Sequence, residues 1–330
     1  MRAQVIRHFG DTSVFTMAEL ARPEIRPGHV LVRVHATSVN PVDFKIRSGL
    51  LPQIAPEFPA VLHGDFAGVI EEVGAGVTEF KVGDAVFGCA GGVKGEGGAL
   101  AEFMLVDADL IAKKPVSLNM AEAAALPLVT LTAWEALFEK IRLKPGQTIL
   151  IHAGTGGVGH VAIQLAAWAG AKVCTTVSSD EKAAVARSLG ASEVINYRNE
   201  SVQDYVERLT GGKGFEVVLD TVGGENIDKS MAAVALYGSI VSIQTLSTHD
   251  LGGLLLKSAS LHVVFMLLPM LHHHERKRHG AILRQAADLA DLGRLKPLID
   301  PRRFSLEEVS KSHALLESGH ALGKVVIQLS

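Results

Sequence analysis

Three glycines, spaced as Gly154-x-Gly156-x-x-Gly159, are the residues of this chain that indicate a chemistry most directly. Glycine lets a backbone turn sharply and approach a pyrophosphate, whose charge is stabilised by the N–H groups of a helix N-terminus. An apolar run at 149–151 precedes the glycines. A helical pattern follows and leads to a second apolar run at 172–177. This order of strand, glycine turn, helix and strand predicts a unit that binds a dinucleotide.

The residues after the second apolar run indicate which dinucleotide binds. A site for NAD usually places Asp or Glu there, about 20 residues after the glycines, to bind the ribose 2′-OH. This chain has Ser178 and Ser179, followed by Lys182. Hydroxyls and a cation suit a 2′-phosphate, which a carboxylate would repel. Asp180 is a late candidate for the ribose, although we expect it to be the N-cap of the next helix. The pattern favours NADPH.

Composition excludes several classes of protein. The 330 residues predict about two domains. A net charge of −3 with 20% charged residues does not suggest a nucleic-acid-binding or polybasic membrane surface. The longest apolar stretch, at 261–271, is too short for a membrane span, and the first residues show no secretory pattern. Cys89 and Cys174 make no disulfide framework, so we expect a reducing cytoplasm.

The pattern of expected secondary structure changes near residue 122. Residues 1–121 are typical of a β-rich domain, whereas the later sequence alternates helix with strand and predicts a parallel, doubly wound sheet. A last apolar run at 323–327 is expected to pair back onto the N-terminal β domain. The strands expected are 30–35, 69–73, 84–87, 193–196, 216–221 and 238–244. The helices expected are one from Asn119 or Glu122 to Pro127, then 130–140, 180–189, 201–209, 281–292 and 306–318.

Together these motifs resemble the medium-chain dehydrogenase/reductase superfamily, and within it the zinc-independent quinone oxidoreductase branch, which is zeta-crystallin-like. The residues that carry the resemblance are 38–43 with Arg47 and Gly49, 63–68, 82–86, 153–159, 220–224 and 323–326. The resemblance implies an α/β protein. Residues 1–121 and 270–330 would form a GroES-like catalytic domain, and 122–269 a Rossmann domain that binds NADPH.

The resemblance also implies roles for individual residues. Asn40 would lie beside the nicotinamide ribose and substrate, and Thr130 near the nicotinamide. The remaining cofactor residues would be Gly154, Gly156, Gly157, Val158 and Gly159 at the pyrophosphate, Ser178, Ser179, Lys182 and Tyr197 at the 2′-phosphate, and Gln244 and Phe265 along the nicotinamide half. Two alternatives stay open: Tyr197 could instead pack on the adenine, and Asn40 could simply begin a turn, as Asn-Pro often does.

Zinc chemistry is disfavoured by residue type. A catalytic zinc needs three protein ligands, usually Cys, His or an acid. The matching positions here hold Asn40, Gly64 and Leu126 or a neighbour, and only Cys89 lies where relatives carry a structural four-cysteine lobe. His63, Asp65 and Cys89 form an alternative set, whose spacing does not suggest a tetrahedral site. We therefore expect no metal.

The expected reaction is hydride donation from NADPH to a quinone or an α,β-unsaturated carbonyl, because no Lewis acid is expected to stabilise an alkoxide. Hydrogen-bond donors would stabilise the developing oxyanion. Lys45 is a candidate donor to the substrate carbonyl, with a solvated surface lysine as the alternative. Lys45 and Leu51 stand where the quinone reductase branch often carries aromatics, which leaves the acceptor open. Asp43 is expected to anchor Arg47 or a backbone turn rather than to act as a base.

The competing functions are a zinc-type alcohol dehydrogenase and a non-catalytic, crystallin-like NADPH-binding protein. We expect a small-molecule partner, no nucleic acid and no membrane, and a homodimer or homotetramer that uses 261–271 as an interface. His272, His273 and His274 are consecutive and so cannot all face one site from a helix. They are expected to be an exposed polar segment.

Overall fold

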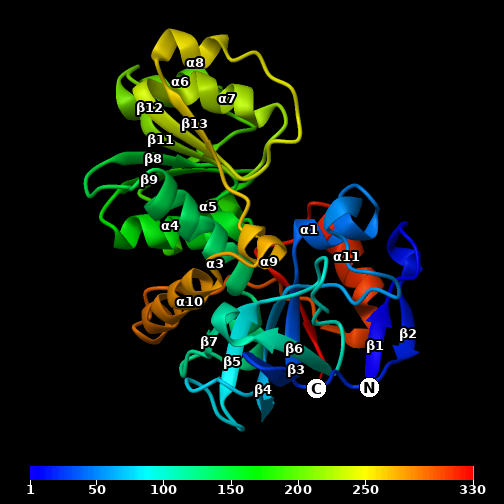
Figure 1. Ribbon diagram of the computed structural model, residues 1–330. Helices are drawn as coiled ribbons and strands as arrows, with labels where there is room; N and C mark the ends of the chain where they lie inside the picture. The colour runs from blue at the N-terminus through cyan, green and yellow to red at the C-terminus, as the bar shows by residue number, and fades with distance from the viewer. Residues whose placement is uncertain (330) are drawn as a thin grey trace. The chain divides into compact units, whose positions relative to one another are not determined.

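The computed structural model describes residues 1–329, and it divides into two compact units (Figure 1). Unit 1 comprises Met1–Leu131 together with the chain from Leu267 onward, and unit 2 comprises Thr132–Met266. The first crossing between them falls inside helix α3 (Pro127–Trp134), which continues into a π-helical segment, Glu135–Lys140. The second unit thus forms an insertion in the first.

Unit 2 contains the parallel sheet that the sequence predicts. Its six strands lie in the order β10-β9-β8-β11-β12-β13 and every pair is parallel. The strands are β8 (Thr148–Ile151), β9 (Lys172–Val177), β10 (Glu193–Asn196), β11 (Phe215–Asp220), β12 (Val234–Ser242) and β13 (Ser260–Val263). The order reverses between β8 and β11, and open sheets of this kind bind ligands beyond the carboxyl ends of the strands at that point.

Helices cover both faces of this sheet, as Figure 1 shows: α4 and α5 lie on one face, and α6, α7 and α8 on the other. Their bounds are α4 (Gly157–Trp168), α5 (Asp180–Ser188), α6 (Val202–Thr210), α7 (Asn226–Ala233) and α8 (Gly252–Lys257). The central strands are buried on both faces, which explains their continuous apolar runs.

Unit 1 is built on a mostly antiparallel sheet. Its strand order is β14-β15-β3-β4-β5-β7, and β6 also pairs with β3. The strands are β3 (His29–Val39), β4 (Asp65–Val73), β5 (Ala85–Cys89), β6 (Phe103–Asp107), β7 (Ile111–Lys113), β14 (Phe304–Ser305) and β15 (Val325–Gln328), with β1 (Arg2–Val5) and β2 (Thr16–Glu19) forming a separate pair. The last strand does return to the N-terminal sheet, since Val325 lies opposite Val39 in an antiparallel register.

The helices of unit 1 are α1 (Pro41–Arg47), α2 (Met120–Ala124), α9 (Leu268–His272), α10 (Arg276–Asp291) and α11 (Val309–Glu317). Short 3₁₀ segments occupy Thr12–Val14, Pro52–Ile54, Ala108–Leu110 and Leu306–Glu308. No helix within residues 1–329 is long and apolar enough to cross a bilayer.

Two helices begin earlier than the sequence suggests. Helix α3 begins at Pro127 rather than Thr130, because proline is favoured in the first turn of a helix, where its missing N–H is not needed. Helix α10 begins at Arg276 rather than Ala281, and so it includes Gly280. A side chain at Gly280 would place its Cβ 2.7 Å from the carbonyl oxygen of Asp109. Tight packing therefore requires glycine at a position where helix propensity alone disfavours it.

Candidate active site

The backbone of the glycine turn in unit 2 packs so closely against its neighbours that two of its positions have no room for a side chain. A Cβ on Gly154 would lie 2.1 Å from Thr175 Oγ1, and a Cβ on Gly159 would lie 2.2 Å from the carbonyl oxygen of Ala153. Helix α4 begins at Gly157, directly after its N-cap Gly156. The first N–H groups of α4 therefore lie next to the turn, and the first turn of this helix contains no acidic residue. This is a favourable place for a phosphate.

Polar groups next to this turn are buried or half-buried and hold its neighbours in place. Thr176 Oγ1 accepts a hydrogen bond from the Ala153 N–H at 3.0 Å, and Thr221 Oγ1 donates to the His152 carbonyl at 2.7 Å. Burial lowers the pKa of His152 to about 4, although the negative charge of Asp220 acts to raise it. The imidazole is therefore neutral near pH 7, and it supports the turn without adding a charge to it.

The end of β9 carries the residues expected at the 2′-phosphate. Ser179, not Asp180, is the N-cap of α5, because the Ser179 Oγ accepts the Lys182 N–H at 3.3 Å. The expectation for Asp180 was wrong: Ser179 has the extended backbone of a cap, whereas Asp180 is already the first helical residue. Ser178 and Lys182 are both half-buried.

Tyr197 follows β10 and is tied to β9, since its N–H donates to the Val177 carbonyl at 3.2 Å. Its side chain is 52% exposed, so the ring is accessible to a ligand, and both of its expected roles stay open. Gln244 packs against Gly223, where a Cβ would lie 2.5 Å from Gln244 Cγ. Gly223 has φ +74°, a conformation that side chains disfavour. Phe265 is 42% exposed and follows β13.

The structure therefore brings the expected cofactor residues of unit 2 to one edge of the sheet. Each follows the carboxyl end of a parallel strand: the glycine turn after β8, Ser178 after β9, Tyr197 after β10, Gln244 after β12 and Phe265 after β13. This is the edge at which sheets of this topology bind their ligands.

In unit 1, Asn40 is the N-cap of α1 and is 1% exposed. Its side chain belongs to a buried polar network that the sequence did not reveal. Asn40 Nδ2 donates to Asp65 Oδ2 at 2.8 Å, and Lys324 Nζ donates to Asn40 Oδ1. Asp65 also accepts the Ser38 hydroxyl at 2.8 Å. Asp65 and Lys324 lie in segments that carry the family resemblance, but nothing in the sequence joined them to Asn40.

Asp43 anchors a backbone turn, one of the two roles expected for it. The Asn40 N–H donates to Asp43 Oδ2 at 2.7 Å, and burial raises the pKa of the Asp43 carboxyl to about 8. Arg47 instead forms a bidentate pair with Glu317, at 2.6 and 3.2 Å. The two side chains therefore fix the two ends of α1 separately.

His63 belongs to a second chain of buried polar side chains. Its Nε2 is 2.8 Å from the Nε2 of His313, and its Nδ1 is 3.1 Å from Thr37 Oγ1. Burial lowers the pKa of His63 to about 3, with the Lys324 charge acting in the same direction. His313 was not anticipated, because no local pattern distinguishes it on its helix.

Thr130 and Lys45 stand apart from these networks. Thr130 lies in α3, is fully buried, and its hydroxyl has no hydrogen-bond partner among residues 1–329. Lys45 is half-buried, and burial lowers the pKa of its ammonium. Within the same residues the Lys45 ammonium makes no hydrogen bond or ion pair, so it is bonded to neither Asn40 nor Asp43.

The donor groups of unit 1 do not fit a zinc ion. A Cβ on Gly64 would lie 2.9 Å from both Cys89 Sγ and the Gly91 carbonyl oxygen, so the position cannot take a histidine without rearrangement. Both ring nitrogens of His63 are engaged by Thr37 and His313. In the part of the chain that is described, no three His, Cys, Asp or Glu side chains are grouped to hold a metal.

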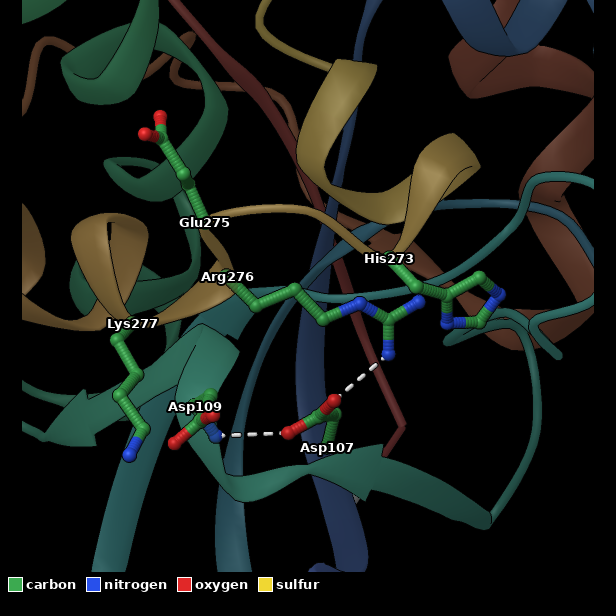
Figure 2. A pocket seen from close by; sticks show the side chains of 6 residues that line it. All are labelled: Asp107, Asp109, His273, Glu275, Arg276 and Lys277. Atoms are coloured by element: carbon green, nitrogen blue, oxygen red, sulfur yellow. Dashed lines mark hydrogen bonds and ion pairs between the residues drawn. The ribbon is translucent and has the colours of Figure 1, made fainter.

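A pocket of about 370 Å³ in unit 1 is lined by charged residues and lies around Arg276 (Figure 2). Arg276 donates to Asp107 Oδ2 at 2.7 Å and to Glu96 Oε1 at 2.6 Å, and Asp107 Oδ1 accepts the Asp109 N–H at 2.9 Å. His273 lines one side of this pocket. His272, His273 and His274 are exposed, as expected. Because the central charges already satisfy one another, the pocket is not a candidate active site.

Comparisons with known proteins agree with this architecture. Residues 26–116 match the family model described as "Alcohol dehydrogenase GroES-like domain", and residues 189–327 match the model described as "Zinc-binding dehydrogenase". Among curated proteins, the 2-methylene-furan-3-one reductase of Solanum lycopersicum is 36% identical, over 99% of this chain and 79% of that protein.

Solved structures agree over the full length. An alcohol dehydrogenase superfamily protein from Novosphingobium aromaticivorans is 41% identical with a TM-score of 0.94, and covers 100% of both chains. The quinone oxidoreductase of Escherichia coli complexed with NADPH is 28% identical with a TM-score of 0.88, over 99% of this chain and 100% of that one. The inserted parallel sheet carries the glycine turn, and β15 returns to the antiparallel sheet beside β3. These features and the full-length matches establish that the chain belongs to the medium-chain dehydrogenase/reductase superfamily.

Proposed function

We propose that this protein is an NADPH-dependent oxidoreductase that transfers hydride to a quinone or an α,β-unsaturated carbonyl. The observation that carries the proposal is the carboxyl edge of the unit 2 sheet, where the glycine turn is bonded to β9 through Thr176 and Ser178 and Lys182 follow the end of that strand. Similarity supports it, since relatives are named 2-methylene-furan-3-one reductase and quinone oxidoreductase, the latter complexed with NADPH.

The residues of unit 2 would act by binding and orientation. The glycine turn and the N-terminus of α4 would receive the pyrophosphate, while Ser178, Ser179 and Lys182 would pair with the 2′-phosphate. Tyr197, Gln244 and Phe265 would line the two ends of the cofactor. When bound, the nicotinamide supplies the hydride. The protein would hold the reacting carbons at about 3–3.5 Å, which accounts for much of the rate of such reactions.

In unit 1, Asn40 and Thr130 are the proposed contacts to the cofactor and the acceptor. Each is almost fully buried, and Thr130 has a hydroxyl that lacks a partner within residues 1–329. A free O–H donor in a dry environment can stabilise a developing oxyanion strongly. Lys45 is a third proposed donor, with an ammonium whose pKa burial lowers.

We propose that the reaction needs no zinc, because Asn40, Gly64 and Leu126 supply no zinc-binding atoms at the matching positions. We also propose a reducing compartment such as the cytoplasm, which suits two buried free cysteines. The assembly proposed is a homodimer or homotetramer. Exposed apolar side chains on α8 and β13, Leu255, Leu256 and Val263, support it.

The test is to follow NADPH absorbance with 1,4-benzoquinone, 9,10-phenanthrenequinone and a small enone, with and without chelator and with NADH in parallel. We expect oxidation that is insensitive to chelator and faster with NADPH than with NADH. Loss of activity in chelator would refute the zinc-free mechanism. Measured NADPH binding without turnover of any acceptor would refute the reductase and favour a binding protein.

A further inference from the structure

Lys324 is a buried lysine whose ammonium is held beside the end of β3. Its side chain is 2% exposed. Its Nζ donates to Asn40 Oδ1 and, at 3.1 Å, to the Val39 carbonyl, and it lies 3.4 Å from Asp65 Oδ2. An ammonium has three N–H donors, and here each has an acceptor. Since burying an unpaired charge is costly, these contacts specify where the ammonium lies.

The backbone of Lys324 is fixed on both sides. The Lys324 N–H donates to the Leu298 carbonyl at 2.8 Å, and its carbonyl accepts the Asp300 N–H at 2.9 Å. The preceding residue, Gly323, has φ +66°, and a Cβ there would lie 2.1 Å from the Leu298 carbonyl oxygen. The lysine therefore extends from a rigid position toward Asn40.

These contacts give the Asn40 amide one orientation. Lysine can only donate a hydrogen bond, and an ionised carboxylate can only accept one. The amide oxygen must then face Lys324 and the amide nitrogen must face Asp65, 2.8 Å away. Rotating the amide by 180° would place N–H groups against the ammonium and the oxygen against the carboxylate. The network thus removes the usual ambiguity of an asparagine side chain.

The same contacts leave part of the Asn40 amide available to hydrogen-bond a ligand. One Nδ2–H is used by Asp65, and the other points to the Ser38 carbonyl at 3.5 Å, longer than an ordinary hydrogen bond. Asn40 can therefore offer one N–H to an acceptor oxygen of a bound molecule.

We infer that Lys324 is a positioning residue, which together with Asp65 holds the Asn40 amide in the orientation needed to hydrogen-bond the cofactor or the acceptor. This inference rests on the proposed function for the role of Asn40, but the orientation itself rests only on the network within unit 1. Lys324 acts through Asn40 and does not itself touch the reactants.

A double-mutant cycle tests the catalytic part of the inference, with NADPH and 1,4-benzoquinone as substrates. Lys324→Met and Asn40→Ala should each lower kcat/KM by about tenfold or more. The kcat/KM of the double variant should be within about twofold of that of the less active single variant. The matched control is Lys311→Met, which removes a lysine that is 71% exposed and should change nothing. Multiplicative effects, or unchanged kinetics in Lys324→Met, would overturn the inference.

A second measurement does not depend on turnover. In protein labelled with ¹⁵N-asparagine, the side-chain N–H signals of Asn40 are identified by their loss in Asn40→Ala. Lys324→Met should speed their hydrogen exchange by about tenfold, because the amide is no longer held. Unchanged exchange would overturn the inference. If the wild type oxidises no NADPH but exchange responds to Lys324→Met, the proposed function fails while the orientation by Lys324 stands.

Lys324→Gln is the second variant should Lys324→Met not fold, because glutamine keeps an N–H donor without the charge. It should retain more activity and slower amide exchange than a variant without a donor. Lys324→Gln could have wild-type stability and yet a kcat/KM as low as that of Asn40→Ala, with Asn40 side-chain exchange about tenfold faster than in the wild type. In that case the hydrogen bond of the lysine is not what positions the amide, and the inference fails.

Discussion

The Nε2 atoms of His63 and His313 lie 2.8 Å apart in the interior of unit 1, although 250 residues separate them in sequence. The rings are stacked, with centroids 5.1 Å apart. One nitrogen must donate and the other accept, so the pair is held together only while at least one of these nitrogens is unprotonated. Arg47 lies at the far end, with its Nη1 3.5 Å from His313 Nδ1.

This pair should make the protein sensitive to acid. Burial lowers the pKa of His63 to about 3 and that of His313 well below its ordinary value of 6.5, so the unfolded chain binds protons that the folded chain does not. The stabilising contribution is therefore complete above pH 6.5 and is lost as the pH falls toward the folded values. His63 should cost about 2 kcal/mol of unfolding free energy between pH 7.5 and pH 5, and His313 should add a loss of the same sign.

Urea unfolding at the two pH values checks this. His313→Gln should reduce the pH-dependent loss of unfolding free energy, whatever its effect at neutral pH. The control is His8→Gln at an exposed position, which should leave the loss unchanged. An equal loss in His313→Gln and the wild type would show that the pair is not responsible.

Gly159→Ala should weaken both unit 2 and NADPH binding. The new Cβ would lie 2.2 Å from the Ala153 carbonyl oxygen, so the turn must open. We expect a loss of about 1–3 kcal/mol in unfolding free energy and a rise of at least about tenfold in the NADPH Kd. Gly97→Ala is the control, because a Cβ at that position would meet no neighbouring group within 4 Å. Thermal unfolding and cofactor titration decide, and wild-type affinity in Gly159→Ala would contradict the role of the turn.

Lys182→Ala should reduce the preference for NADPH over NADH. Loss of one charge-assisted hydrogen bond costs about 1.5–3 kcal/mol, which corresponds to a rise of roughly 10–100-fold in the NADPH Kd with the NADH Kd unchanged. The matched control is Lys172→Ala, at the opposite end of β9. Fluorescence titration with both cofactors measures the effect. Parallel losses for NADPH and NADH would place Lys182 away from the 2′-phosphate.

Arg276→Met should destabilise unit 1 by about 3–5 kcal/mol, because the buried Glu96 and the partly buried Asp107 would keep their charges without a partner. The two contacts are 2.6 and 2.7 Å long. Adding Glu96→Gln and Asp107→Asn should recover most of the loss, since the unpaired charges are then removed. Chemical unfolding of the single and triple variants checks this. A triple variant no more stable than Arg276→Met would show that unpaired charges are not the cause of the lost stability.

Val263→Lys should dissociate the proposed oligomer. β13 is an edge strand of the sheet in unit 2, and Val263 is 46% exposed. Leu255 and Leu256 of α8, the preceding helix, are 81% and 84% exposed. A lysine on an edge strand opposes pairing with another chain. Sedimentation velocity should show a smaller species than the wild type, while Leu292→Lys in unit 1, 73% exposed, should not change the mass. A monomeric wild type would contradict the assembly.

The sequence by itself determined the elements that local patterns specify. The glycine turn, the alternation of strand and helix and the bounds of β10 were all predicted from local patterns, as was the start of α2 at Asn119 as one of two alternatives. Even there, a cap could shift by one residue, as between Asp180 and Ser179, because neighbouring polar residues differ only in which one takes the extended backbone.

Only the tertiary structure decided which distant residues meet. Asn40 and Lys324 lie 284 positions apart, and Arg276 and Glu96 lie 180 apart. Such pairs leave no periodic pattern, since the backbone brings them together only when β15 pairs with β3 or α10 packs on its sheet. The same packing made Gly280 part of a helix that propensity alone would have started later. Burial then set the pKa of each group, and this required knowing what surrounds it.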